Sequence, residues 1–166
     1  MANEEKNKTN GPGFLTSLLL LVIKLLIVAG LAVMIFTFIF GLSRNQSLNM
    51  QPAVQDGDLL LYYRIVQNYQ ADQIVIVRYD GRKLPARVIA TAGDTVDITA
   101  EGLVVNGSSV VEPAVLGETT QFQNAVTFPL TVGQGQVFLL GDNRENAVDS
   151  RVFGCVDEHD IQGKRD

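Results

Sequence analysis

The sequence has very little of the residues that cross-link a chain or bind metals. Its 166 residues include one cysteine, Cys155, and one histidine, His159. A single cysteine cannot form an internal disulfide, and the apolar residues around Cys155 predict a buried, inert thiol. No cluster of cysteine and histidine has the spacing of a metal site. We therefore expect neither a metal nor another cofactor.

Basic charge is also scarce, since the formal net charge is −5. No stripe of lysine and arginine is present, which argues against a nucleic-acid partner. The chain also lacks an internal repeat, and no convincing amphipathic helix follows residue 41. The length suits one compact domain plus an appendage.

The chain does contain one long apolar run, over residues 14–40. Roughly 20 apolar residues suffice to span a bilayer as a helix, whereas the apolar region of a cleaved secretory signal has only about 7–15. We therefore predict an uncleaved membrane anchor, preceded by a flexible tail over residues 1–13. We expect the Lys24 side chain to extend toward the nearer, N-terminal interface. Together with Lys6 and Lys8, it favours a cytoplasmic N-terminus.

The sequence after residue 41 alternates short apolar runs with turn residues. Residues 42–50 are polar and predict a linker. Asn106-Gly107 indicates a hairpin, because this pair readily supplies the two positive φ angles of a tight turn. The pattern predicts a mainly β domain, a sandwich or barrel, over residues 41–166. Strands are predicted at 56–64, 74–77, 87–90, 95–99 and 137–140, and the hairpin is predicted over 103–111.

A dense polar loop follows the last of these strands, from Gly141 to Gly154. Asp149 and Arg151 are spaced so that an extended strand would place both side chains on one face. We expect such a loop to be fixed by internal hydrogen bonds and ion pairs. A salt-bridged surface turn without a functional role is the alternative interpretation.

Four stretches stand in order behind the predicted anchor. They are Ser47-Leu48-Asn49-Met50-Gln51-Pro52 with Asp56-Gly57-Asp58; Ala71-Asp72 with residues 74–77; residues 85–94, PARVIATAGD; and residues 141–154, GDNRENAVDSRVFG. In this order they resemble the conserved boxes of the type I signal peptidase family (peptidase S26-like). The fold class that this resemblance implies is mainly β: an N-terminal transmembrane helix followed by an extracytoplasmic all-β signal-peptidase-like domain.

The departures from the family pattern concern its chemistry. The family cleaves peptide bonds with a serine that a neutral lysine activates, and a second serine orients the lysine. The resemblance places Asn49, Ala86 and Ala147 at these positions. A carboxamide has no ionisable hydroxyl and alanine offers no base, so we expect that the chain is not an enzyme. Natural divergence explains Asn49 better than laboratory inactivation, for which alanine is the usual choice.

The resemblance also implies which residues of the family's site are retained around Asn49, Ala86 and Ala147. Ser47 matches a position whose hydroxyl helps to stabilise the oxyanion. The implied degenerate cleft consists of Ser47, Asn49, Met50, Pro52, Ala86, Arg87 and Ala147. The implied structural loop is braced by Asp142, Arg144, Asp149 and Arg151.

The resulting hypothesis is a non-enzymatic accessory or chaperone-like factor in Gram-positive pilus assembly. The implied partners are a pilin subunit, an extended peptide, the lipid membrane, and sortase or other pilus proteins. The implied location is the cell membrane, crossed once, with the C-terminal domain extracellular. One alternative is an active signal peptidase with displaced residues, starting from Ser47 and Lys83. Along an extended chain, Ser47 lies about 6–7 Å from Asn49, and Lys83 lies about 10 Å from Ala86. Another is a structural anchor without peptide affinity.

Overall fold

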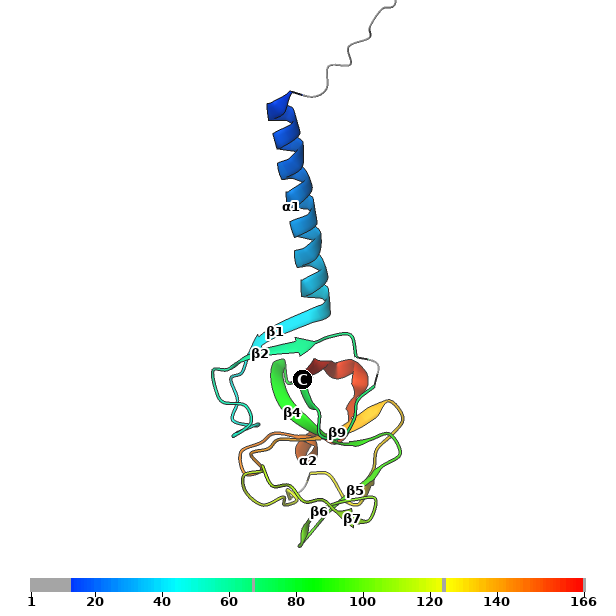
Figure 1. Ribbon diagram of the computed structural model, residues 1–166. Helices are drawn as coiled ribbons and strands as arrows, with labels where there is room; N and C mark the ends of the chain where they lie inside the picture. Colours follow the sequence, from blue (N-terminus) through cyan, green and yellow to red (C-terminus); the bar gives the residue numbers. More distant parts are fainter. Residues whose placement is uncertain (1–12, 67, 124, 166) are drawn as a thin grey trace, which may run out of the picture. The chain divides into compact units, whose positions relative to one another are not determined.

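A computed structural model of the chain describes residues 13–66, 68–123 and 125–165 (Figure 1). The chain divides into two units, Met1–Phe38 and Ile39–Asp166. The tail expected over residues 1–13 lies outside the described residues except for Gly13.

The first unit is dominated by one helix, α1 (Phe14–Ile39), which coincides with the apolar run. At 1.5 Å per residue it is roughly 40 Å long, and the hydrocarbon core of a bilayer is about 30 Å thick. No residue of α1 is buried by protein. Its length and composition make it a candidate membrane span.

The second unit is built from two antiparallel sheets (Figure 1). The larger sheet has the order β1-β2-β11-β3-β4-β9-β10 and the smaller one β7-β6-β5-β8. Two short helical segments, α2 (Ser150–Phe153) and the 3₁₀ helix η1 (Glu158–Asp160), flank β10. The strands are β1 (Phe40–Arg44), β2 (Leu59–Tyr63), β3 (Ile74–Tyr79), β4 (Arg82–Thr91), β5 (Thr95–Thr99), β6 (Gly102–Val105), β7 (Ser108–Ser109), β8 (Leu130–Thr131), β9 (Gln136–Leu140), β10 (Val156–Asp157) and β11 (Ile161–Arg165).

The mainly β fold behind an apolar helix is confirmed, and each predicted strand region contains a strand. Asn106 and Gly107 have φ angles of 52° and 77° and form the predicted hairpin turn. The linker expected over residues 42–50 is wrong for its first three residues, which belong to β1. They are polar in part, but backbone pairing with β2 over five residues outweighs that composition.

The core lies against both faces of β9. Val137 and Leu139 pack into one apolar cluster, and Phe138 and Leu140 pack into another, which also contains side chains of β5 and β6. Burial on both faces explains why this strand reads as a continuous apolar run and not as an alternating one. A third cluster joins β2 and β3 to the segment before β2; its buried members are Met50, Val54, Leu60, Tyr62 and Ile76.

The strand β11 has a polar sequence and was not predicted, yet it lies between β2 and β3. Its Gly163 has a φ of 151°, and a Cβ there would collide with the backbone oxygen of Tyr63. Close approach of β11 to β2 therefore requires glycine at this position.

We expect Gly163→Ala to destabilise the second unit by about 1–3 kcal/mol more than Gly102→Ala, because overpacking is added to backbone strain. Gly102 is the matched control: its φ is also positive, at 112°, but a Cβ there would meet nothing within 4 Å. Urea unfolding of the detergent-solubilised chain, followed by tyrosine fluorescence, measures both. Equal losses in the two variants would contradict the close packing described here.

Candidate functional site

The segment before β2 is shaped by a buried amide, Asn45. Its Nδ2 donates to the backbone oxygens of Ser47 and Gln55 at 2.9 and 2.8 Å. Its Oδ1 accepts from the backbone nitrogen of Ser47 at 3.2 Å and from the Ser47 hydroxyl at 3.0 Å. Ser47 is half-buried, and its hydroxyl is thus already engaged as a donor.

Asn49 ties this segment to the polar loop about a hundred residues later. Its Nδ2 donates to the backbone oxygen of Val148 at 3.0 Å, and its Oδ1 accepts from the Val148 nitrogen at 3.4 Å. The nitrogen of Asn143 donates to the Asn49 backbone oxygen at 2.9 Å. Gly141 lies so close to the Asn49 backbone and to Ala147 that a Cβ would collide with both. The fold therefore brings Asn49 and Ala147 together.

Ala86 lies on β4, buried in the cluster with Val75 and Val88. It faces away from Lys83, because residues an odd number apart point to opposite faces of a strand. The amine of Lys83 donates to the Tyr62 hydroxyl at 2.9 Å. Lys83 thus bonds to Tyr62 on one face of β4, whereas Ala86, the position at which the family has its lysine, lies on the other face.

The first half of β4 is paired on one side only. Residues 82–86 pair with β3, whereas pairing with β9 begins at Arg87, opposite Leu140. Among the residues that the structure describes, no strand pairs with the other edge of residues 82–86. This open edge of β4 is the main feature near the predicted cleft that could accept an extended chain.

The remaining predicted cleft residues have different surroundings. Met50 is fully buried in the third apolar cluster, whereas Pro52 is exposed. Arg87 donates from Nε and Nη2 to the carboxylate of Asp142 at 2.8 and 2.6 Å. This hydrogen-bonded pair raises the pKa of the Arg87 guanidinium above its ordinary value. Met50 and Arg87 thus contribute packing and bracing in the folded chain.

Asp149 and Arg151 form a fully buried, two-bond ion pair, with Nε–Oδ1 and Nη2–Oδ2 distances of 2.9 Å. The extended strand expected here is wrong. Asp149 is the N-cap of α2 and accepts from the backbone nitrogen of Arg151, which lies in that helix. Aspartate is a favoured helix N-cap. Its second oxygen accepts from the nitrogen of Gly141 at 3.0 Å, which fixes the start of the loop.

Arg144 is buried and connects the loop to a segment that the sequence did not single out. Its Nε donates to the Gly141 oxygen at 2.8 Å, and its Nη1 donates to Glu112 at 2.7 Å and also to Thr119. Leu116, between these two partners, pairs with Asn143. Sequence reasoning missed Glu112 and Thr119 because no pattern links a loop residue to a partner about thirty positions away.

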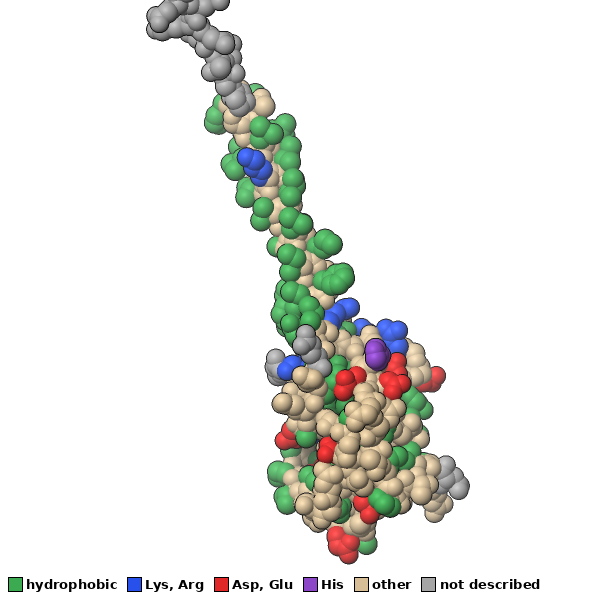
Figure 2. Space-filling view, turned by 90° about the vertical axis from the view of Figure 1, so that its right-hand side faces the viewer, with side chains coloured by type: hydrophobic (Ala, Val, Ile, Leu, Met, Phe, Trp, Pro, Cys, Tyr) green, Lys and Arg blue, Asp and Glu red, His purple; other side chains and the backbone are tan. Residues whose placement is uncertain are grey.

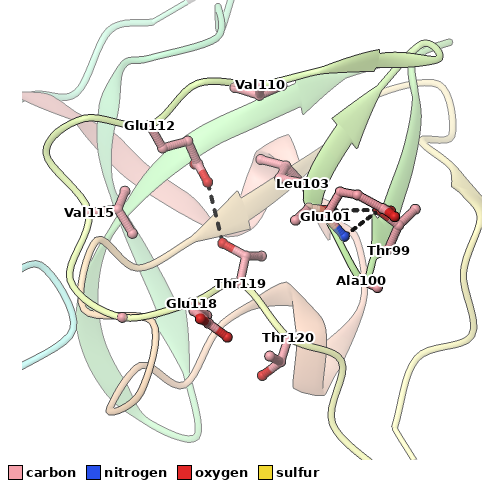
Figure 3. A pocket seen from close by; sticks show the side chains of 12 residues that line it. Thr99, Ala100, Glu101, Leu103, Val110, Glu112, Val115, Glu118, Thr119 and Thr120 are labelled. Atoms are coloured by element: carbon pink, nitrogen blue, oxygen red, sulfur yellow. Dashed lines mark hydrogen bonds between the residues drawn. The ribbon is translucent and has the colours of Figure 1, made fainter.

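A pocket of about 380 Å³ is lined by residues of this segment, among them Glu112 and Thr119, and by residues of the β5–β6 turn (Figure 3). The Glu112 side chain points toward Thr119, which donates to it at 3.3 Å. None of the residues around the pocket belongs to the predicted cleft. The described residues contain no group of three or more His, Cys, Asp or Glu placed to hold a metal.

Cys155 is half-buried and not fully buried as expected. Desolvation raises the pKa of its thiol, which keeps the sulfur in the protonated, poorly nucleophilic form at neutral pH.

The chain matches the model of one protein family, "Signal peptidase, peptidase S26", over residues 18–166. It is 33% identical over 152 residues to signal peptidase I of Bacillus licheniformis, covering 84% of this chain and 81% of that protein. It is 31% identical over 156 residues to the probable signal peptidase I-1 of Synechocystis, covering 85% and 77%. A crystal structure of a signal peptidase I from Enterococcus faecalis matches with a TM-score of 0.51 and 28% identity. That match covers 61% of this chain and 99% of the other.

These comparisons contradict the expectation that the chain is not an enzyme. The relatives are named signal peptidase I, and nothing in the matches marks this chain as a degenerate form. The expectation rested on three positions, whereas a nucleophile and its base are defined by their geometry in the folded site and not by their place in the sequence. The model match and the coverage of these relatives show that the chain belongs to the signal peptidase family, peptidase S26.

Proposed function

We propose that this protein is a membrane-anchored member of the signal peptidase family that binds an extended segment of an exported protein. The open edge of β4 is the observation that carries the proposal. An extended peptide can add to such an edge as a further strand, through backbone hydrogen bonds. Five residues of open strand offer about 17 Å, enough for roughly five residues of a bound segment.

The segment around Asn49 is linked to both ends of this edge through intermediate residues. At one end, Lys83 bonds to Tyr62, which packs in the same cluster as Met50. At the other end, Arg87 pairs with Leu140, and the next residue, Gly141, lies against the Asn49 backbone. A bound strand along residues 82–86 would therefore pass the segment that the resemblance assigns to the cleft.

We further propose that α1 crosses the cell membrane once, with the N-terminus in the cytoplasm and the second unit outside. The charge of Lys24 in the N-terminal half of α1 and the lysines before the helix support this orientation. The proposed exported partner is a pilin subunit, with sortase or other pilus proteins as further contacts. The resemblance to signal-peptidase-like proteins of Gram-positive pilus assembly supports these partners.

Cleavage of secretory signal peptides by displaced residues is the second candidate function. The names of the relatives support it. The candidate groups are the hydroxyl of Ser47, in the segment before β2, and the amine of Lys83, in the open edge of β4 itself. Each would have to leave its present partner, Asn45 or Tyr62, before it could act as nucleophile or base.

The first test of peptide binding uses the full chain in detergent and a fluorescently labelled pilin precursor. We expect saturable binding in an anisotropy titration. Asn49→Ala should weaken it roughly tenfold, because the variant loses both side-chain hydrogen bonds that hold the segment against Val148. Asn146→Ala is the matched control, since its exposed side-chain amide bonds, among the described residues, to its loop neighbour Asn143 alone. A flat titration with the unaltered chain, or equal affinity for the Asn49→Ala variant, would contradict the proposed binding mode.

The same mixture tests cleavage when it is sampled over time and separated by electrophoresis. If displaced residues act, Ser47→Ala and Lys83→Ala should each abolish the product band, whereas Ser109→Ala, at an exposed residue outside the open edge, should not. The absence of a product with saturating unaltered chain, or a product that persists in both variants, would rule out this assignment.

Deletion of the gene in the source organism tests the pilin partner. We expect the ladder of pilin polymers in cell-wall extracts to shorten or disappear, and re-expression of the full chain to restore it. A normal ladder in the deletion strain would exclude a role in pilus assembly, whatever the peptide titration shows.

A further inference from the structure

The smaller sheet ends in a strand, β7, whose outer side is open. Among the described residues, β7 pairs with β6 alone, and this pairing continues to Val110, whose nitrogen donates to Leu103 at 2.9 Å. Hydrogen-bonded and non-bonded pairs alternate in an antiparallel ladder, so the backbone groups of Val111 point away from β6. Edge strands are usually blocked by lysine, proline or a bulge, whereas residues 108–111 read Ser-Ser-Val-Val. This edge can accept a further strand.

Two hollows adjoin beside this edge. One is the pocket of Figure 3, and the other, of about 530 Å³, is lined mainly by apolar side chains. Val110, Glu112 and Val115 line both. Val111 lines the second hollow and is 86% exposed. We call the two hollows together the valine groove. A strand added to β7 would place every second side chain beside Val110, in this groove.

The charge around the valine groove is of one sign. Residues 88–143, which contain the smaller sheet, include no lysine, arginine or histidine. Toward the bottom of Figure 2, acidic side chains are visible on the second unit and basic ones are not. The acidic residues of this stretch are Asp94, Asp97, Glu101, Glu112, Glu118 and Asp142.

Two of these acids border the groove and are accessible to a ligand. Glu101 and Glu118 are exposed and, in the part of the chain that the structure describes, form no ion pair. The one cation among the described residues that line either hollow is Arg87, which is held by Asp142 at 2.6 Å. A second copy of this chain would bring like charges together, which is unfavourable. The charge therefore favours a basic partner.

We propose that the edge of β7 and the valine groove bind an extended segment of a partner protein that combines apolar residues with lysine or arginine. The backbone of the segment pairs with Val111, its apolar side chains enter the groove, and its cations approach Glu101 and Glu118. Strand addition of this kind supplies affinity through the backbone and specificity through alternate side chains. The β7 edge belongs to the smaller sheet and β4 to the larger, so this inference does not depend on binding at the open edge of β4.

The test uses the full chain in phosphatidylcholine nanodiscs, whose neutral lipid does not attract a cationic probe. The probe is the fluorescently labelled peptide KSVSVSK, which places its lysines and valines on one face of a strand. We expect a saturable rise in anisotropy that the peptides ESVSVSE and KSSSSSK do not produce. Raising sodium chloride from about 0.05 to about 0.5 M should weaken binding, because salt screens exposed charges.

A pair of charge variants locates the cations of the probe. Glu101→Gln combined with Glu118→Gln should weaken binding roughly fivefold, since each exposed ion pair contributes at most a few-fold to affinity. Asp157→Asn combined with Asp160→Asn is the matched control. It removes the same charge from two exposed residues outside the groove, and binding should be unchanged.

A backbone variant locates the added strand. Val111→Pro removes the outward-pointing N–H of the edge and should abolish binding, because proline has no N–H to donate. Val111→Ala keeps the N–H at the same exposed position and should retain most of the affinity. Asn49→Ala, in the segment linked to the open edge of β4, should bind the probe like the unaltered chain.

Three results would overturn the proposal. A flat titration with KSVSVSK would exclude the site. Equal affinity for KSVSVSK and ESVSVSE, or no loss in the Glu101→Gln and Glu118→Gln variant, would show that the acids of the groove do not select the partner. Loss of binding in Asn49→Ala but not in Val111→Pro would place the peptide at the open edge of β4, in agreement with the proposed function but not with this inference.

Discussion

The burial of two guanidinium groups behind one polar loop constrains the rest of the second unit. Arg144 and Arg151 are both inaccessible to water, and an unpaired buried charge costs several kcal/mol. Asp149 neutralises Arg151, Glu112 neutralises Arg144, and the backbone oxygens of Gly141 and Arg144 accept further hydrogen bonds from the two guanidinium groups. Each partner comes from a different stretch of chain, so the charges are compensated only when the loop, α2 and the segment around Glu112 adopt this arrangement.

The buried Asp149–Arg151 pair also positions the candidate site, through contacts with the backbone. Asp149 fixes the nitrogen of Gly141, and Gly141 leaves no space between itself and Asn49. Asn49 is then held from two sides, by Asn143 and by Val148. The open edge of β4 begins where Arg87 pairs with the residue before Gly141. The segment around Asn49 and the open edge of β4 are therefore both positioned by the start of the loop, which Asp149 fixes. Neither of them contains a member of the Asp149–Arg151 pair.

Local signals in the sequence predicted the features that depend on local physics. The apolar run predicted α1, and Asn106-Gly107 predicted its hairpin, because turn geometry is decided within four residues. The strand β11 escaped prediction because its polar residues are stabilised by neighbours about a hundred positions earlier. Asp149 was expected on a strand because a spacing of two residues fits two alternatives. It places Asp149 and Arg151 on one face of a strand, and it also fits a helix N-cap followed by a residue of the first turn. Side-chain identity at Asn49, Ala86 and Ala147 proved an unsafe guide to activity once the relatives were compared.

The position of β11 has a consequence for the order in which the molecule can be completed. It is the last strand in the sequence, yet it separates β2 from β3 in the middle of the larger sheet. The ribbon of β1 and β2 that follows α1 therefore acquires its neighbouring strand only after residues 161–165 have been synthesised. Until then, β2 and β3 each present an unpaired edge, and such edges are prone to pair with other chains. The first strands to be synthesised are thus among the last to be enclosed, and the unfinished sheet is exposed to wrong pairing until β11 is in place.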